Sequence, residues 1–499
     1  MPNPATVDPA ALDRFIVDLV EAGFEPDGSG RIWSGPLDPA LAELTTATIM
    51  QIALRNGWPF LAPYVLADGL RPSVHLQGRV LCLWRTGDDS LAWLRLADLR
   101  QRIAQWAERY RGRATLDDPV LDPHMYWEPH VAEPLAVVDL SAIRWGDGGS
   151  GELRAERTDG RLEIGSAGPL RVRWYGREAM RHPPVNLGML TDGLKRGQTR
   201  NLEHELERVG HAGGINVLIL IWQTPVGEPN VLTLGLSRAA DGSVHAEAYE
   251  TARIDTDVLI RRAGPDAASL RGRSVILFGV GALGSQLGML LARSGIGELR
   301  LVDGQLLRPG DIVRHAVPRW FVGRNKAIGT AVAVESPAPW TIVRPHAEAV
   351  WDPEVLQKAI RGSDLVVDAV GEPAFTEQLS RLLQAEPRAA LSAALFRDGD
   401  VARVRIYQPG GRPWHDRPAD AGYPPIPPPA TEDAPTWETG CAAPVNNAPP
   451  VSVASAAAFA ARAAVEVLQG REAASPDLIE IYRGIGEAPF DRVGYLRFG

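Results

Sequence analysis

A glycine-rich turn is the first feature of this sequence that could do chemistry. It separates the apolar run Ser274–Phe278 from a stretch with helical periodicity that extends to about residue 293, and its glycines are Gly279, Gly281 and Gly284. Such glycines let the backbone turn tightly and approach a phosphate group, while the following helix offers unpaired N–H groups. Asp303 ends the next apolar run, where a carboxylate can accept hydrogen bonds from ribose hydroxyls. The pattern alone predicts a site for NAD, FAD or ATP, with a purely structural turn as the alternative.

Three charged residues downstream distinguish between these nucleotides. Arg314 and Lys326 follow Asp303, and Asp368 ends a further apolar run. Two cations and a second carboxylate at a strand end are more than hydride transfer requires. Phosphoryl or nucleotidyl transfer uses such groups, because positive charge stabilises the departing pyrophosphate and a carboxylate can hold Mg²⁺. Each residue alone could be a solvated surface charge, but their combined order favours ATP.

The chain has only two cysteines, Cys82 and Cys441, and no CxxC pair that could hold zinc. Cys441 lies in a proline-rich loop that we expect from residue 409 to 450, followed by an alanine-rich helix from Val451 to Leu468. Proline-crowded loops seldom bury a thiol, so a reactive nucleophile is favoured there over a packed residue. Cys82 is flanked by leucines, and both a catalytic and a core position are open for it.

Three regions are expected to position these residues. Residues 1–132 have amphipathic periodicity at about 9–22 and again at 96–110, which predicts an α+β domain. Residues 133–254 consist of short apolar or alternating runs separated by glycine, which predicts a β-rich domain without evident chemistry. Residues 255–499 alternate strand-like and helical stretches and are predicted to form an α/β domain around the glycine turn.

The overall composition indicates a soluble cytoplasmic protein. The chain has 499 residues, of which 45% are hydrophobic, and a formal net charge of −9. That charge argues against an extended nucleic-acid surface. The first residues lack the basic and apolar regions of a signal peptide. Apolar runs also fall short of the ~20 residues needed to span a membrane, so we expect no membrane partner.

Residues 271–372 resemble the ThiF-type adenylating domain shared by ubiquitin-activating enzymes and the sulfur-carrier adenylyltransferases of thiamin and molybdopterin synthesis. The resemblance rests on the glycine turn, the segment SGIGELRLVD, and the order arginine, lysine, aspartate. It implies a Rossmann-like fold in which Asp303 binds the ATP ribose, Arg314 and Lys326 contact the phosphates, and Asp368 ligates Mg²⁺. It also implies a homodimer, in which Arg261 and Arg262 stand where the family often donates an arginine to the partner's site.

This chain departs from the family pattern at several positions. Gln305 replaces a second aspartate, Asp311 replaces an asparagine before the arginine, and His315 replaces a glutamine after it. The paired CxxC zinc motifs of the small bacterial members are also absent. These differences argue against a simple sulfur-carrier enzyme.

Both cysteines fit a second resemblance, to bacterial activating enzymes fused to a ubiquitin-conjugating domain. In such enzymes a loop comparable to that of Cys441 carries the cysteine that accepts the activated carboxylate. Residues 8–130 resemble the conjugating fold through a histidine, a glycine turn and a Cys-Leu pair, here His75, Gly78 and Cys82. The resemblance implies transfer at Cys82 and makes His75 the candidate oxyanion stabiliser, since the eukaryotic His-Pro-Asn tripeptide is missing.

The sequence therefore predicts an enzyme that adenylates the C-terminal glycine of a ubiquitin-like or other partner protein. Cys441 would capture the acyl group and pass it to Cys82 for conjugation to a lysine of a target. The organisation resembles that of bacterial anti-phage conjugating enzymes and ubiquitin-like operons. A NAD- or FAD-dependent oxidoreductase and an inactive ThiF-like binding scaffold remain alternatives. Because a β-rich region separates the cysteines, we expect their thiols to lie tens of ångströms apart at rest.

Overall fold

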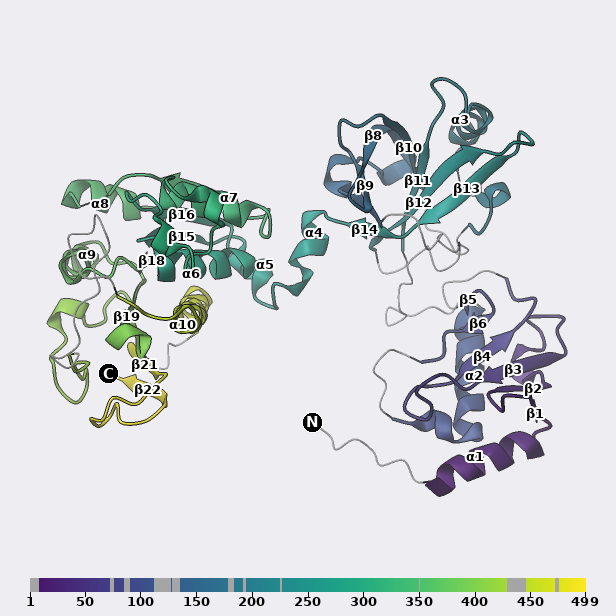
Figure 1. The fold of residues 1–499 in the computed structure, drawn as a ribbon, viewed down its shortest axis with the longest axis horizontal. Helices are drawn as coiled ribbons and strands as arrows, with labels where there is room; N and C mark the ends of the chain where they lie inside the picture. Colours follow the sequence, from purple (N-terminus) through teal and green to yellow (C-terminus); the bar gives the residue numbers. More distant parts are fainter. Residues whose placement is uncertain are drawn as a thin grey trace. The chain divides into compact units, whose positions relative to one another are not determined.

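The computed structural model describes residues 9–71, 76–84, 90–111, 127, 135–177, 184–191, 194–224, 227–349, 351–428, 446–471 and 475–499. The chain forms two compact units, Met1–Asp255 and Thr256–Gly499. The first unit contains a six-stranded and an eight-stranded sheet, and the second contains another eight-stranded sheet (Figure 1). The expected division into three domains stays a prediction.

The first sheet is antiparallel, with strand order β1-β2-β3-β4-β6-β5, and it lies between two helices in sequence. Helix α1 (Pro9–Glu21) and helix α2 (Leu96–Tyr110) form as their apolar periodicity predicts, and they bury Phe15, Leu19 and Ile103 against the sheet. Cys82 follows the last short strand directly. The strands are β1 (Glu25–Pro26), β2 (Ile32–Pro36), β3 (Ile49–Ala53), β4 (Tyr64–Ala67), β5 (Leu76–Gln77) and β6 (Val80–Leu81).

The second sheet is mixed, with order β13-β12-β11-β10-β8-β9-β7-β14. Its central strand β11 buries six consecutive residues, as expected for a strand covered on both faces. Helix α3 (Arg196–Glu207) packs on one of these faces through Leu202. The strands are β7 (Leu135–Val138), β8 (Ser150–Thr158), β9 (Arg161–Ile164), β10 (Leu170–Arg177), β11 (Val217–Gln223), β12 (Pro229–Arg238), β13 (Val244–Tyr249) and β14 (Thr251–Arg253).

The third sheet contains the glycine turn and has the order β17-β16-β15-β18-β19-β20-β21-β22. The first five strands in that order are parallel, and the last three are antiparallel. The chain leaves β15 towards β16 and β17, then crosses back to β18, so a topological switch point lies between β15 and β18. The strands are β15 (Ser274–Phe278), β16 (Glu298–Val302), β17 (Ile342–His346), β18 (Leu365–Asp368), β19 (Ala390–Phe396), β20 (Val401–Tyr407), β21 (Asp477–Ile481) and β22 (Gly494–Phe498).

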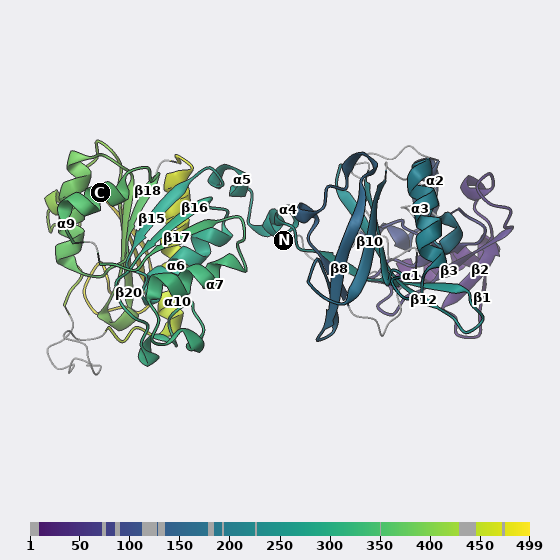
Figure 2. The ribbon, with the colours of Figure 1, turned by 90° about the horizontal axis from the view of Figure 1, so that it is seen from above.

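Helices cover both faces of this third sheet. Helices α6 (Ala282–Arg293), α7 (Lys326–Glu335) and α10 (Pro450–Leu468) pack on one face. Helices α8 (Pro353–Ile360) and α9 (Pro373–Ala385) pack on the other. Figure 2 shows α9 on the side of the sheet opposite α6 and α10. Short helices α4 (Thr256–Leu259) and α5 (Ala267–Leu270) precede the sheet. The predicted α/β fold is confirmed.

Helix α10 corrects one expectation. It has 19 residues and is long and apolar enough to cross a membrane by length and composition, although sequence analysis found no run approaching that length. In the structure α10 packs against α6 and the sheet, and its alanines, including Ala457 and Ala460, belong to the core. Small residues at this contact let the helix approach the sheet closely, which explains the composition without a membrane.

Candidate active site

The glycine turn connects β15 to α6 at the topological switch point, and two of its glycines are required by geometry. Gly279 has φ +77°, and a Cβ there would lie 2.7 Å from the carbonyl atoms of Ala369 beyond β18. A Cβ on Gly284 would lie 1.9 Å from the Gly279 carbonyl oxygen. Gly281 differs, because a Cβ there would meet nothing within 4 Å. This open position is where a ligand can approach the backbone.

A cavity of about 420 Å³ opens at the carboxyl ends of β15, β16 and β18. This is the edge of a doubly wound sheet where ligands bind, next to the N-terminus of α6. Three aromatic side chains form part of its wall, with ring centroids 5.4 Å apart for Phe278–Phe375 and for Trp351–Phe375. The residues that line the cavity are Phe278, Gly279, Gly281, Val302, Asp303, Gly304, Gln305, Glu348, Ala349, Trp351, Ala369, Val370, Glu372 and Phe375.

Asp303 stands at the end of β16 with its carboxylate fixed from two sides. One carboxylate oxygen accepts a hydrogen bond from the Val280 N–H at 2.7 Å, and the other accepts one from the Gln305 N–H at 2.8 Å. The carboxylate thus ties the glycine turn to the loop after β16. Each oxygen keeps a second lone pair, so Asp303 can still accept from ribose hydroxyls in the cavity.

Lys326 lies directly behind the cavity wall. It is the first residue of α7, whose N-cap Asn325 accepts from the Ala327 N–H at 2.9 Å. The Lys326 ammonium donates to the side-chain oxygen of the cavity residue Gln305 at 3.0 Å and pairs with Asp311 at 3.3 Å. The side chain is 9% exposed. The Lys326 ammonium is therefore one hydrogen bond away from the cavity wall.

Arg314 and His315 are not among the residues that line the cavity. The Arg314 guanidinium donates to the carbonyl oxygens of Asn446 and Ala448, which precede α10. His315 is buried, and its Nε2 bonds to the Val280 carbonyl of the glycine turn at 2.7 Å. Burial lowers the pKa of His315, so the neutral ring donates this hydrogen bond. His315, which replaces the glutamine of the family pattern, therefore helps to hold the glycine turn.

Asp368 lies under the switch point and is 2% exposed. Its carboxyl accepts hydrogen bonds from the hydroxyls of Thr376 (2.6 Å) and Ser392 (3.1 Å) and from the Val370 N–H (3.1 Å). Burial raises the pKa of Asp368. Among the described residues, no group of three or more His, Cys, Asp and Glu side chains could hold a metal. Mg²⁺ needs only one or two carboxylates beside phosphate and water, so Asp368, with exposed Glu372 at the cavity, fits such a site if one hydrogen bond is exchanged.

Comparison with known proteins identifies the domain that carries this geometry. Residues 255–481 match the ThiF family. The ThiF domain thus includes the glycine turn, Asp303, Lys326 and Asp368. It also includes the cavity and the whole of α10.

Individual relatives match only parts of the chain. A protein named ATP-dependent ubiquitin transferase-like protein Cap2, from Enterobacter hormaechei, is 29% identical over 24% of this chain and 20% of its own length. A SAMP-activating enzyme E1 from Haloferax volcanii is 31% identical over 25% of this chain and 46% of its own length. The solved structure of E. coli MccB with MccA-N7isoASN is 17% identical, covers 48% of this chain and 67% of that one, and has a TM-score of 0.37. The chain spans less than half the length of both curated relatives.

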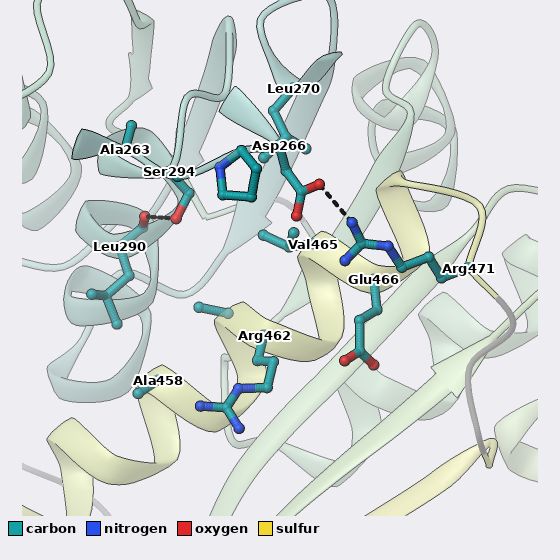
Figure 3. Close-up of a pocket in the computed structure, with 13 residues that line it drawn as sticks. Ala263, Asp266, Leu270, Leu290, Ser294, Ala458, Arg462, Val465, Glu466 and Arg471 are labelled. Carbon is teal, nitrogen blue, oxygen red and sulfur yellow. Dashed lines mark hydrogen bonds and ion pairs between the residues drawn. The ribbon is translucent and has the colours of Figure 1, made fainter. Parts of the chain in front are cut away.

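A second cavity of the ThiF domain, of about 360 Å³, is unsuited to phosphate. It lies at the C-terminal end of α6, beside Leu290 and Ser294, and α10 forms its other wall. Figure 3 shows Asp266 directed at Arg471, with which it forms an ion pair, and Arg462 and Glu466 extending from α10. The C-terminus of α6 carries partial negative charge, and the charges of Asp266 and Glu466 are offset by those of Arg462 and Arg471. The cavity at the glycine turn is therefore the candidate active site.

Cys82 is partly buried, beside the buried residues Leu81 and Leu83. Burial raises its pKa to about 11, although the Gln77 N–H donates to the sulfur and opposes that shift. A thiol with this pKa is almost wholly protonated at neutral pH. His75 and Cys441 lie outside the described residues. Their roles, and the expected separation of the two thiols, stay predictions.

Sequence analysis located the turn and Asp303 but missed much of the cavity. Four residues that line the cavity belong to no recognisable sequence motif: Glu348, Trp351, Glu372 and Phe375. Gln305 has a weaker signal in the sequence, because it departs from the family pattern, and it lies in the cavity wall.

Proposed function

We propose that the ThiF domain binds ATP with Mg²⁺ in the cavity at the glycine turn and adenylates the C-terminal carboxylate of a partner protein. One observation carries the proposal. A ThiF family domain coincides with a nucleotide-sized cavity at the switch point of its sheet, lined by Asp303 and backed by Lys326. The names of the relatives Cap2 and SAMP-activating enzyme E1 favour a ubiquitin-like or other protein as the partner, and we propose that this partner ends in glycine.

Each residue at the cavity would have its own role in adenylation. The N–H groups at the start of α6 would face the phosphates, with Gly281 leaving the space that they need. Asp303 would hold the ribose, and Lys326 would leave Gln305 to stabilise the pyrophosphate. Asp368 would hold Mg²⁺, which would supply positive charge to neutralise the phosphates. The partner's carboxylate oxygen attacks the α-phosphorus, a P–O bond to pyrophosphate breaks, and an acyl-adenylate forms.

Three acyl transfers would follow. The Cys441 thiolate attacks the acyl carbon, a C–S bond forms, and the C–O bond to AMP breaks, so that AMP leaves with the electron pair. Transthiolation to Cys82 then releases Cys441 as thiolate. A lysine amine of a target displaces Cys82 and forms an amide. We propose that these steps take place in the cytoplasm and in a homodimer, whose arginines at positions 261 and 262 serve the partner's site.

The order of elements around Cys82 supports a conjugating-like role for the N-terminal region. An amphipathic helix, a sheet, the glycine turn at Gly78, the Cys-Leu pair and a second helix follow one another as the resemblance implies. Gly78 has φ +58°, as expected for a turn glycine. Burial raises the pKa of Cys82, so its thiol would have to lose its proton when it attacks the Cys441 thioester.

Thioester trapping with cysteine variants tests this function. The partner probe is a small ubiquitin-like protein that ends in glycine. Cys441→Ala should form adenylate without a reducible adduct, and Cys82→Ala should accumulate an adduct at Cys441. A Cys82 adduct in the Cys441→Ala protein would contradict the relay. Flavin absorbance or NADH binding by the purified protein would instead favour the oxidoreductase alternative, and absence of any adenylate would favour the scaffold.

A further inference from the structure

A row of polar side chains crosses the third sheet, starting at Asp368. Asp368 on β18 is in register with Ser392 on β19. Ser392 is in register with Arg405 on β20, which is in register with Asp477 on β21. Side chains in register on neighbouring strands lie on the same face of a sheet. Thr376 of α9 bonds to Asp368, so this is the face that α9 and an apolar core cluster cover. Polar groups are costly there unless they bond to one another.

Hydrogen bonds join the first three residues of the row into a chain. The Arg405 guanidinium donates to the Ser392 hydroxyl oxygen at 3.3 Å, and the Ser392 hydroxyl donates to Oδ2 of Asp368 at 3.1 Å. A guanidinium can only donate, and a hydroxyl has a single proton to give. Ser392 must therefore accept from Arg405 and direct its own proton at Asp368. Arg405 thus fixes the direction in which the Ser392 hydroxyl donates.

The two carboxylate oxygens of Asp368 are held differently. Oδ2 accepts from two hydroxyls, those of Ser392 at 3.1 Å and Thr376 at 2.6 Å. Oδ1 accepts one hydrogen bond among the described residues, from the Val370 N–H at 3.1 Å, and Val370 lines the cavity. Each carboxylate oxygen has about two acceptor sites, so Oδ2 is fully occupied. Oδ1 is therefore the oxygen that can turn from its hydrogen bond to a ligand in the cavity.

The far end of the row holds Arg405 in place. Asp477 is 0% exposed and forms an ion pair with Arg403, whose Nε donates to it at 2.9 Å. The Arg405 guanidinium carbon lies 5.8 Å from the centroid of the Trp414 ring, within reach of a cation–π contact. Arg403 already balances the charge of Asp477, and the hydrogen bond of Arg405 runs the other way, towards Ser392. Arg405 thus acts on Asp368 through one intervening hydroxyl.

We infer that Ser392 and Arg405 are positioning residues for the metal ion of the adenylation reaction. The inference rests on the proposed function, in which Asp368 holds Mg²⁺. Neither side chain is among those that line the cavity. Together they hold Oδ2 from behind, so that Oδ1 is the oxygen presented to the metal ion. Partners that orient a ligating carboxylate in this way commonly raise metal affinity tenfold or more.

Three variants isolate this pair. Ser392→Ala removes the hydroxyl from the chain and should fold, since the next two residues of β19 are alanines as well. Arg405→Met keeps an apolar stem and removes the charge and the donors. Ser380→Ala is the matched control, because it also removes a buried hydroxyl, one that bonds to His415 at 2.9 Å instead of to Asp368.

The metal dependence of nucleotide binding is the decisive readout, and it needs neither a partner protein nor catalysis. A non-hydrolysable ATP analogue is titrated into each full-length protein by calorimetry, in EDTA and over a series of Mg²⁺ concentrations. The Mg²⁺ concentration that gives half of the gain in affinity should rise about tenfold in Ser392→Ala and in Arg405→Met. Affinity in EDTA should stay within about twofold of the parent, because neither residue contacts the nucleotide. Ser380→Ala should match the parent in both conditions.

The double variant tests whether the two residues act as one unit. If Arg405 acts through the Ser392 hydroxyl, its loss adds little once that hydroxyl is gone. Ser392→Ala combined with Arg405→Met should then raise the half-maximal Mg²⁺ concentration about tenfold, as each single variant does. Two independent effects would multiply to about a hundredfold.

A half-maximal Mg²⁺ concentration at the parent value in Ser392→Ala would overturn the inference. An equal loss of affinity in EDTA, a similar change in Ser380→Ala, or a hundredfold effect of the double variant would also overturn it. Pyrophosphate exchange by the parent with the partner probe judges the proposed function separately. Metal-dependent nucleotide binding without that exchange would contradict adenylation and leave the positioning role supported. A parent whose nucleotide affinity does not respond to Mg²⁺ would overturn both.

Discussion

The nucleotide cavity and the Cys82 segment are both candidate reaction sites, but they are built in opposite ways. The cavity is formed by backbone turns at the ends of parallel strands, where Gly279 lies against the backbone of Ala369 and Asp303 accepts from the Val280 N–H. Cys82 depends on its surroundings instead, since burial sets its pKa. The nucleotide cavity is thus specified by backbone geometry. The reactivity of Cys82 is specified by desolvation and by the group that docks beside the thiol. The following predictions test that difference.

The largest effect is expected from Gly284→Ala in the glycine turn. Its added Cβ would meet the Gly279 carbonyl at 1.9 Å, and backbone cannot yield as a side chain can. We expect the free energy of unfolding to fall by about 3 kcal/mol or more, measured by urea denaturation. Gly281→Ala is the matched control, because its Cβ meets nothing. It should keep stability within about 0.5 kcal/mol and weaken ATP binding by calorimetry. Equal stability of the two variants would contradict the geometric account.

An intermediate effect is expected at Asp368. Asp368→Ala leaves the donors of Thr376, Ser392 and Val370 without their acceptor, which should destabilise the fold by about 2–3 kcal/mol. Asp368→Asn can keep these contacts, because hydroxyls also accept hydrogen bonds, and should stay within about 1 kcal/mol. Both variants should lose pyrophosphate exchange. Full exchange in Asp368→Asn would exclude the carboxylate as the Mg²⁺ ligand.

The smallest effect concerns Cys82 and pH. Its pKa is raised from an ordinary 9.0 to about 11, so the neutral thiol stabilises the fold below pH 9. That contribution is lost as pH rises towards 11. Pulsed iodoacetamide labelling of Cys82, read by mass spectrometry, should therefore keep increasing about tenfold per pH unit between pH 8 and 10. The urea-unfolded chain should level off near pH 9. A plateau of the folded protein below pH 9 would show that Cys82 is an activated thiolate.

Sequence periodicity predicted the α/β core because each strand and helix carries its own pattern. Leu299–Val302 and the helix after Gly281 illustrate this. The contacts of the turn Arg397–Gly399 could not be predicted in the same way, since Asp398 accepts a hydrogen bond from Asn447, 49 positions away. Burial of Cys82 depends on the packing of α2 and several strands, and no local pattern encodes it. The contact of Arg314 with Asn446, 132 positions away, could likewise not be predicted from neighbouring residues.

Isotope exchange between ATP and pyrophosphate tests the central claim most directly. The protein, Mg²⁺, labelled pyrophosphate and the glycine-terminated partner probe are incubated, with omission of the partner and truncation of its terminal glycine as controls. We predict label in ATP only when the intact partner and Mg²⁺ are both present, with AMP as the nucleotide product once thioester forms. No exchange, or cleavage of ATP to ADP and phosphate, would contradict adenylation at this site.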